Sequence, residues 1–63
     1  MDLSDIKPGM RVVIVAKDHF FAFVHGWTGQ VRGLNNGLVE VAATNPNGQP
    51  VTLYVPPDQL GPL

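Results

Sequence analysis

Apolar residues form a continuous run near the start of the chain. Residues 10–16 read Met-Arg-Val-Val-Ile-Val-Ala and follow the turn-forming pair Pro8-Gly9. Valine and isoleucine favour extended backbone, and a short apolar run without alternation is typical of a strand buried on both faces. The pattern predicts a first strand over residues 10–16 that is covered on both sides.

Three later segments alternate apolar with polar residues, which is the period of a strand with one buried face. The predicted inner faces hold Trp27, Gly29, Val31 and Gly33 in residues 27–34, Val39 and Val41 in residues 38–43, and Val51, Leu53 and Val55 in residues 51–55. Gly29 leaves room for a close backbone approach, and in small barrels such a glycine is typical of a bend where the strand passes from one side of the barrel to the other.

Turn-forming residues separate these segments. Asn36-Gly37 supplies the two positive-φ residues of a tight hairpin turn between the second and third strands. Residues 45–50, Asn-Pro-Asn-Gly-Gln-Pro, predict a second turn. Residues 17–26 show no alternation and are expected to form a long, partly apolar loop, and residues 58–60 fit one helical turn that carries Leu60 into the core.

A chain of 63 residues has room for one core, so we expect a single domain over residues 1–63, with its folded core in 8–60. The chain has no cysteine to form a disulfide, and small cores are commonly supplemented by a partner or by self-association. We therefore expect a protein partner or an oligomer.

Charge argues against several classes of partner. Four Lys and Arg residues against five Asp and Glu residues give a net charge of −1, which disfavours nucleic-acid binding. Apolar runs are too short to span a bilayer, and the first residues are acidic where a secretory signal would be basic. The sequence predicts a soluble, cytoplasmic protein that does not bind membranes.

The order of these features resembles the Src-homology-3-like small-barrel superfamily over residues 8–60. The shared features are a strand after Pro-Gly, a long loop, a strand with Trp-x-Gly-x-Val (Trp27 to Val31), two hairpins and a closing Asp-Gln-Leu turn. The resemblance implies an all-β fold, a small barrel of about five short antiparallel strands with a terminal single-turn helix.

Three groups within that superfamily are similar to this chain. One group is the small barrel subunits of photosynthetic complexes, which are docking subunits without active sites. This chain resembles them at Gly9, Val12, Ile14, residues 18–21, residues 29–31 and Leu60. KOW-type modules of transcription and translation factors, which bind RNA or protein, are resembled by residues 8–12, 29–31, 50–53 and 59–60. The first resemblance implies an accessory subunit, and the second an RNA-binding module.

The third group is the type II dihydrofolate reductase, which works as a tetramer around a central pore. Residues 27–31 and 51–54 look like its Trp-x-Gly-Gln-Ile and Val-Gln-Ile-Tyr segments, but Thr52 stands where that family has the glutamine that contacts both ligands. This resemblance implies an NADPH-dependent homotetrameric enzyme and is kept as a second alternative.

Candidate chemical groups are few. His19 and His25 are candidate metal ligands or acid–base groups, but Asp18 is the only nearby carboxylate, and no thiol completes a metal-binding set. Ser4 has no features of an activated nucleophile. We expect no metal, no cofactor and no catalytic residues.

Aromatic residues are the most informative group for function. Phe20, Phe21, Phe23 and Trp27 lie within eight residues, too many for all of them to enter so small a core. Our hypothesis is a binding or self-association face formed by Phe20, Phe21, Phe23, Trp27 and Tyr54, with His19 and His25 at its polar rim. The sequence thus predicts a non-catalytic protein-interaction or accessory subunit, with an RNA-binding KOW-like module as the first alternative.

Overall fold

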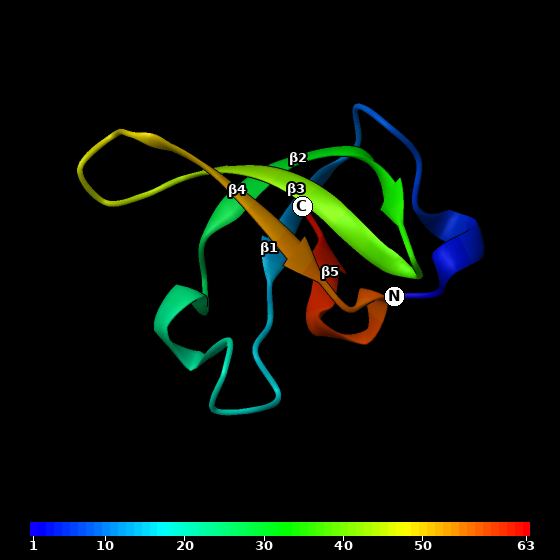
Figure 1. The fold of residues 1–63 in the computed structure, drawn as a ribbon, viewed down its shortest axis with the longest axis horizontal. Helices are drawn as coiled ribbons and strands as arrows, with labels where there is room; N and C mark the ends of the chain where they lie inside the picture. Colours follow the sequence, from blue (N-terminus) through cyan, green and yellow to red (C-terminus); the bar gives the residue numbers. More distant parts are fainter.

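A computed structural model describes residues 1–63 as five strands and three short 3₁₀ helices (Figure 1). The elements in chain order are η1 Leu3–Asp5, β1 Arg11–Ile14, η2 Ala22–Val24, β2 Thr28–Asn35, β3 Leu38–Thr44, β4 Pro50–Val55, η3 Pro57–Gln59 and β5 Leu60–Pro62. None of the helical segments has the length and apolar character needed to cross a membrane. The protein is therefore an all-β small domain, as expected.

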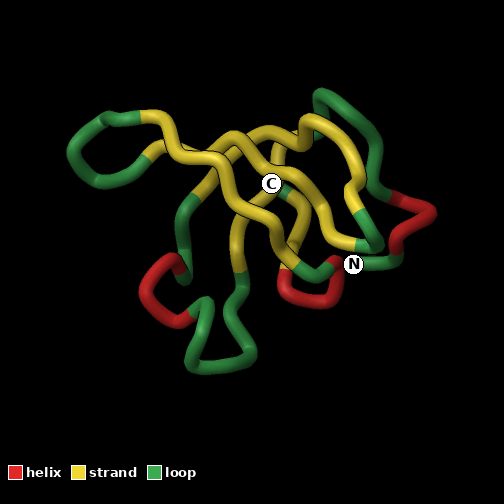
Figure 2. The backbone as a smooth tube through the Cα atoms, in the orientation of Figure 1, coloured by secondary structure: helices red, strands yellow, loops and turns green.

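The strands form one antiparallel sheet in the order β4-β3-β2-β1-β5. In Figure 2 the long segment between β1 and β2 projects from one end of the sheet, and the turn between β3 and β4 projects from a different part of the sheet. The middle strand is β2, and β5 pairs with β1 at one edge, whereas β4 lies at the opposite edge. Both β4 and β5 are edge strands.

The hairpin between β2 and β3 is confirmed. Asn36 and Gly37 have φ angles of 53° and 80°, and Asn35 pairs with Leu38 across the turn. Positive φ at both central residues is the geometry for which Asn-Gly is favoured. The register of the same pair of strands shifts between Val31 and Gly33, which is a local irregularity of the ladder.

The prediction for the first strand is wrong in two respects. The strand is shorter, Arg11–Ile14, and its burial alternates, with Val12 and Ile14 buried and Arg11 exposed. Val15, which follows, keeps 40% of its surface exposed. A chain this short has only enough apolar side chains to cover one face of the sheet, so the continuous apolar run does not indicate burial on both faces.

The core lies on the inner face of the sheet. Its buried residues are Ile6, Val12, Ile14, Phe21, Val24, Val31, Val39, Val41, Ala43, Val55 and Leu60. The predicted close approach at Gly29 is confirmed, because a Cβ atom there would lie 2.6 Å from the carbonyl oxygen of Ala42. Leu60 is buried as expected, but it begins β5 after the helical turn, which spans Pro57–Gln59.

Candidate interaction groove

An apolar hollow of about 530 Å³ lies between the loop 17–26 and strand β4. We call it the Phe groove. Its lining residues are Phe20, Phe21, Phe23, Leu38, Thr52, Leu53, Tyr54 and Pro56. No charged residue lines it, so the groove is suited to an apolar, uncharged ligand surface.

One wall of the Phe groove is built by the loop and anchored by Phe21. The Phe21 side chain is only 8% exposed and joins the core, and the ring of Phe20 packs edge-on against it with a centroid distance of 4.9 Å. Phe20 and Phe23 are 75% and 71% exposed. The loop therefore buries one ring and presents two to solvent, an arrangement typical of a binding surface.

Hydrogen bonds to Asp18 hold this loop in place. Its Oδ1 accepts a bond from the Phe21 backbone N–H at 3.0 Å, and its Oδ2 accepts one from Nε2 of Gln59 at 2.9 Å. The bond from Phe21 lowers the pKa of the Asp18 carboxyl most, and the bond from Gln59 lowers it further, because both bonds favour the ionised form. The carboxylate thereby ties the aromatic loop to the segment before β5.

The other wall comes from β4 and its neighbours. Thr52, Leu53 and Tyr54 are consecutive in β4, and Tyr54 is 45% exposed on the outer face, as its alternation with Leu53 and Val55 predicts. Leu38 begins β3, and Pro56 follows β4 immediately. The wall therefore comes from the edge strand of the sheet and from one residue on each side of it.

Trp27 does not line the Phe groove. It precedes β2, where its carbonyl oxygen accepts a hydrogen bond from the Ile14 N–H at 2.8 Å, and its half-buried side chain packs against the core. The structure thus brings Phe20, Phe21, Phe23 and Tyr54 together and places Trp27 outside the groove.

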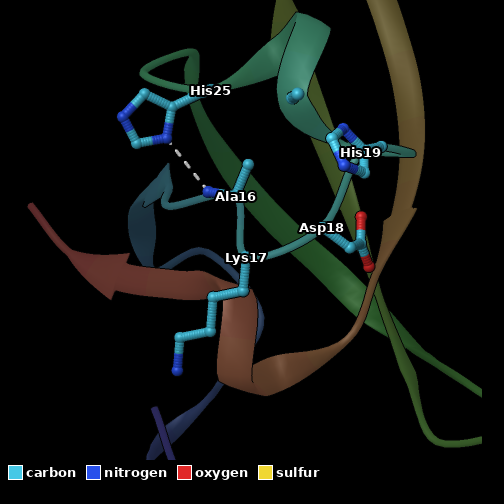
Figure 3. A pocket seen from close by; sticks show the side chains of 6 residues that line it. Ala16, Lys17, Asp18, His19 and His25 are labelled. Carbon is cyan, nitrogen blue, oxygen red and sulfur yellow. Dashed lines mark hydrogen bonds between the residues drawn. The ribbon is translucent and has the colours of Figure 1, made fainter.

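His19 and His25 line a separate polar hollow with Ala16, Lys17, Asp18 and Ala22. Figure 3 shows the two imidazoles on different sides of this hollow, with His25 bonded to the backbone of Ala16. The Ala16 N–H donates to Nδ1 of His25 at 3.0 Å, so the proton of the neutral ring lies on Nε2. No group of three or more His, Cys, Asp or Glu residues is placed to hold a metal ion.

The sequence reasoning missed four lining residues and one supporting residue. Leu38, Thr52, Leu53 and Pro56 belong to segments far from the loop in sequence, and only the outward positions of Leu38 and Thr52 followed from the alternation. Gln59 is buried, and its Oε1 accepts a hydrogen bond from the Lys17 N–H at 2.9 Å. No sequence signal separates this glutamine from an exposed one.

No known protein-family model matches the chain, and neither a curated protein nor a solved structure matches it.

Proposed function

We propose that this protein is a non-catalytic interaction domain or accessory subunit that binds another polypeptide in the Phe groove. The observation that carries this proposal is the exposure of Phe20 and Phe23 beside an uncharged groove. Aromatic side chains give large contact area with few rotatable bonds, and groups of them outside a core are characteristic of interaction surfaces.

The chemistry of the groove limits the class of partner. Its lining has no Lys, Arg, Asp or Glu, so it offers no partner for a phosphate or a carboxylate. The hydroxyl groups of Thr52 and Tyr54 are its only polar side-chain atoms. A segment with apolar, uncharged side chains fits this lining best.

Features of the strand arrangement support a relation to the Src-homology-3-like barrels. These are the long loop between β1 and β2, the two hairpins that follow, and the helical turn before β5. The accessory-subunit reading of that superfamily agrees with the apolar groove, whereas an RNA-binding reading would need a basic face.

The test is a selection of random peptides for binding to the protein, followed by comparison of two double variants. Phe20→Ser with Phe23→Ser removes the exposed rings and leaves Phe21 in the core. We expect selected peptides to be apolar, and their affinity to fall at least about tenfold for this variant, as expected for loss of aromatic anchors.

The matched control is Leu34→Ser with Leu63→Ser, which removes two exposed apolar residues outside the groove. Circular dichroism checks that both variants fold. Peptides that bind the two variants equally well, or a selection that enriches no peptide at concentrations where the chain is monomeric, would contradict the proposed function.

A further inference from the structure

Strand β4 lies at the edge of the sheet, and its residues Thr52, Leu53 and Tyr54 line the Phe groove. Which of its residues point outward follows from the ladder with β3. The Asn45 N–H donates to the Gln49 carbonyl at 2.9 Å, just beyond the paired residues Thr44 and Pro50. In antiparallel strands bonded and non-bonded pairs alternate, so Val51, Leu53 and Val55 bond to β3.

Thr52 and Tyr54 therefore direct their N–H and C=O groups away from the sheet. The pairing of β3 with β2 gives the same result. The backbone of Val31 bonds to Met10 on the β1 side, so the N–H and C=O groups of Gln30 point toward β3 and its partner Ala42. The direction alternates along β3, so the N–H and C=O groups of Ala43 point toward β4. No backbone hydrogen bond outside the ladder involves Thr52 or Tyr54. The groove thus contains an unpaired strand edge as well as aromatic rings.

Prolines limit this edge at both ends. Pro50 begins β4 and Pro56 follows it, and neither has an N–H to donate. Leu53 lies midway between them, with Thr52 and Tyr54 on either side. The edge is therefore symmetrical about Leu53 in its N–H donors.

We propose that a second copy of this chain occupies the groove, with the two β4 strands paired antiparallel about a twofold axis at Leu53. In this register Thr52 of each copy exchanges N–H···O=C bonds with Tyr54 of the other. Pro50 lies opposite Pro56, where no donor exists in either strand. Both outward N–H groups of the edge, those of Thr52 and Tyr54, thus find an acceptor in the other copy, through the same contact on both chains, as in an isologous interface.

Charge permits this pairing. No charged side chain lines the groove, and the chain has a net charge of only −1, so two copies repel each other weakly. Natural sheets commonly protect an exposed edge with lysine or another charge on the strand, but β4 carries none. The two Leu53 side chains would meet beside the phenylalanine rings of both loops.

This inference rests on the proposed function, because the second copy occupies the same groove. Its first test is the Leu53→Cys variant. The chain has no other cysteine, so this substitution introduces the only thiol. At a non-bonded antiparallel pair the two Cα atoms lie about 4.5 Å apart, which a disulfide can bridge. We expect mild oxidation to convert this variant into a covalent dimer.

The matched control is Val51→Cys on the same face of the same strand. In the proposed register the two copies of residue 51 are displaced by roughly 14 Å along the strands, beyond the reach of a disulfide. We expect no rapid cross-link from this variant. Cross-linking of both variants alike would overturn the register, because it indicates parallel or sliding strands.

A second measurement uses the unmodified protein. We expect light scattering to give twice the chain mass at high concentration, and amide exchange at Thr52 and Tyr54 to slow at least about tenfold as dimer forms. A dimer in which these two amides stay unprotected, or a monomer from micromolar to millimolar concentration, would overturn the proposal.

The peptide selection is read separately from these results. A monomer whose groove still binds peptides would leave the proposed function in place with a different partner. An Leu53→Cys dimer that is unaffected by loss of Phe20 and Phe23 would support edge pairing but contradict the role of the aromatic rings.

Discussion

The two edges of the sheet differ in whether their outward backbone groups have hydrogen-bond partners within the chain. At the β5 edge, the Ile14 N–H bonds to Trp27 in the direction of β2, so the backbone groups of Val13 point toward β5 and its partner Gly61. The backbone groups of Leu60 and Pro62 therefore point away from the sheet. The Leu60 carbonyl accepts a hydrogen bond from the Met1 nitrogen at 3.4 Å, and Pro62 has no N–H. At the β4 edge, Thr52 and Tyr54 have no such partners within the chain.

The difference shows which edge of the sheet has backbone groups free to pair with a further strand. An edge whose donors are absent or already bonded cannot add another strand, whereas an unpaired edge is a template for one. The exposed rings of Phe20 and Phe23 line the same groove as the β4 residues Thr52 and Tyr54. The apolar contact area and the free backbone groups thus occur on the same side of the sheet.

The largest effect on stability is expected between the two edges, at Gly29 in β2. Gly29→Ala places a methyl group 2.6 Å from the Ala42 carbonyl oxygen and 2.8 Å from Cγ1 of Val41, so the central strands must separate. We expect the free energy of unfolding in urea to fall by about 3 kcal/mol, as for strong overpacking.

Gly33→Ala in the same strand is the control, because nothing lies within 4 Å of the added methyl group and the φ angle is ordinary. We expect its stability to change by less than about 1 kcal/mol. Equal destabilisation by the two substitutions would show that strand propensity, and not the close approach, explains the glycine.

A smaller loss is expected from Gln59→Leu next to the closed edge. The substitution keeps the approximate size of the buried side chain but removes the acceptor for the Lys17 N–H and the donor to Asp18. We expect the free energy of unfolding to fall by about 2 kcal/mol, because a partly buried N–H loses its partner.

Its control is Gln49→Leu, which removes a hydrogen bond of 3.2 Å to Asn45 in the exposed β3–β4 turn. That change should cost less than about 0.5 kcal/mol. If both glutamine variants lose the same stability, the link between Gln59 and the aromatic loop contributes nothing specific.

Acid is expected to weaken the same link. The pKa of Asp18 is lowered in the folded protein, chiefly by the Phe21 N–H and next by Gln59, so the unfolded chain binds the proton more readily. This contribution to stability is complete above the ordinary carboxyl pKa near 3.8 and is lost as the pH falls through the lower folded value. Unfolding measured from pH 6 downward should show the decline.

Asp18→Asn removes the titrating group and should flatten that part of the pH profile. The remaining slope then belongs to the other carboxyl groups. A profile that is unchanged by the substitution would rule out Asp18 as its source.

The smallest effect on stability is expected from restoring single edge donors. Pro50→Val adds an N–H next to Thr52 on the open edge, whereas Pro62→Val adds an isolated N–H on the closed edge. Each should change stability by less than about 1 kcal/mol. We expect Pro50→Val to raise self-association, measured by light scattering, and Pro62→Val to leave it unchanged; the reverse order would contradict the comparison of the edges.

Local signals predicted much of the fold because their causes are local. The Asn36-Gly37 turn, the alternation around Val39 and Val41, and the close approach at Gly29 each depend on backbone preference or on the period of a strand. The extent of the first strand could not be predicted in the same way. Burial at Val12 and exposure at Val15 depend on how much of the sheet the remaining chain covers.

The candidate groove could likewise be predicted only in part from the sequence. The excess of aromatic residues in the loop was visible in the sequence, but not which ring is buried: Phe21 enters the core, while Phe20 and Phe23 remain outside. Leu38, Leu53 and Pro56 join them only through tertiary contacts.

By itself, the sequence determined the all-β class, the main turns and the surplus of aromatic side chains, because these follow from residue type and spacing. Only the tertiary structure decided that β4 is an unpaired edge, that Trp27 lies apart from the groove, and that β5 is closed. Strand order and the partners of edge groups depend on contacts between distant segments, and a one-dimensional pattern does not specify those contacts.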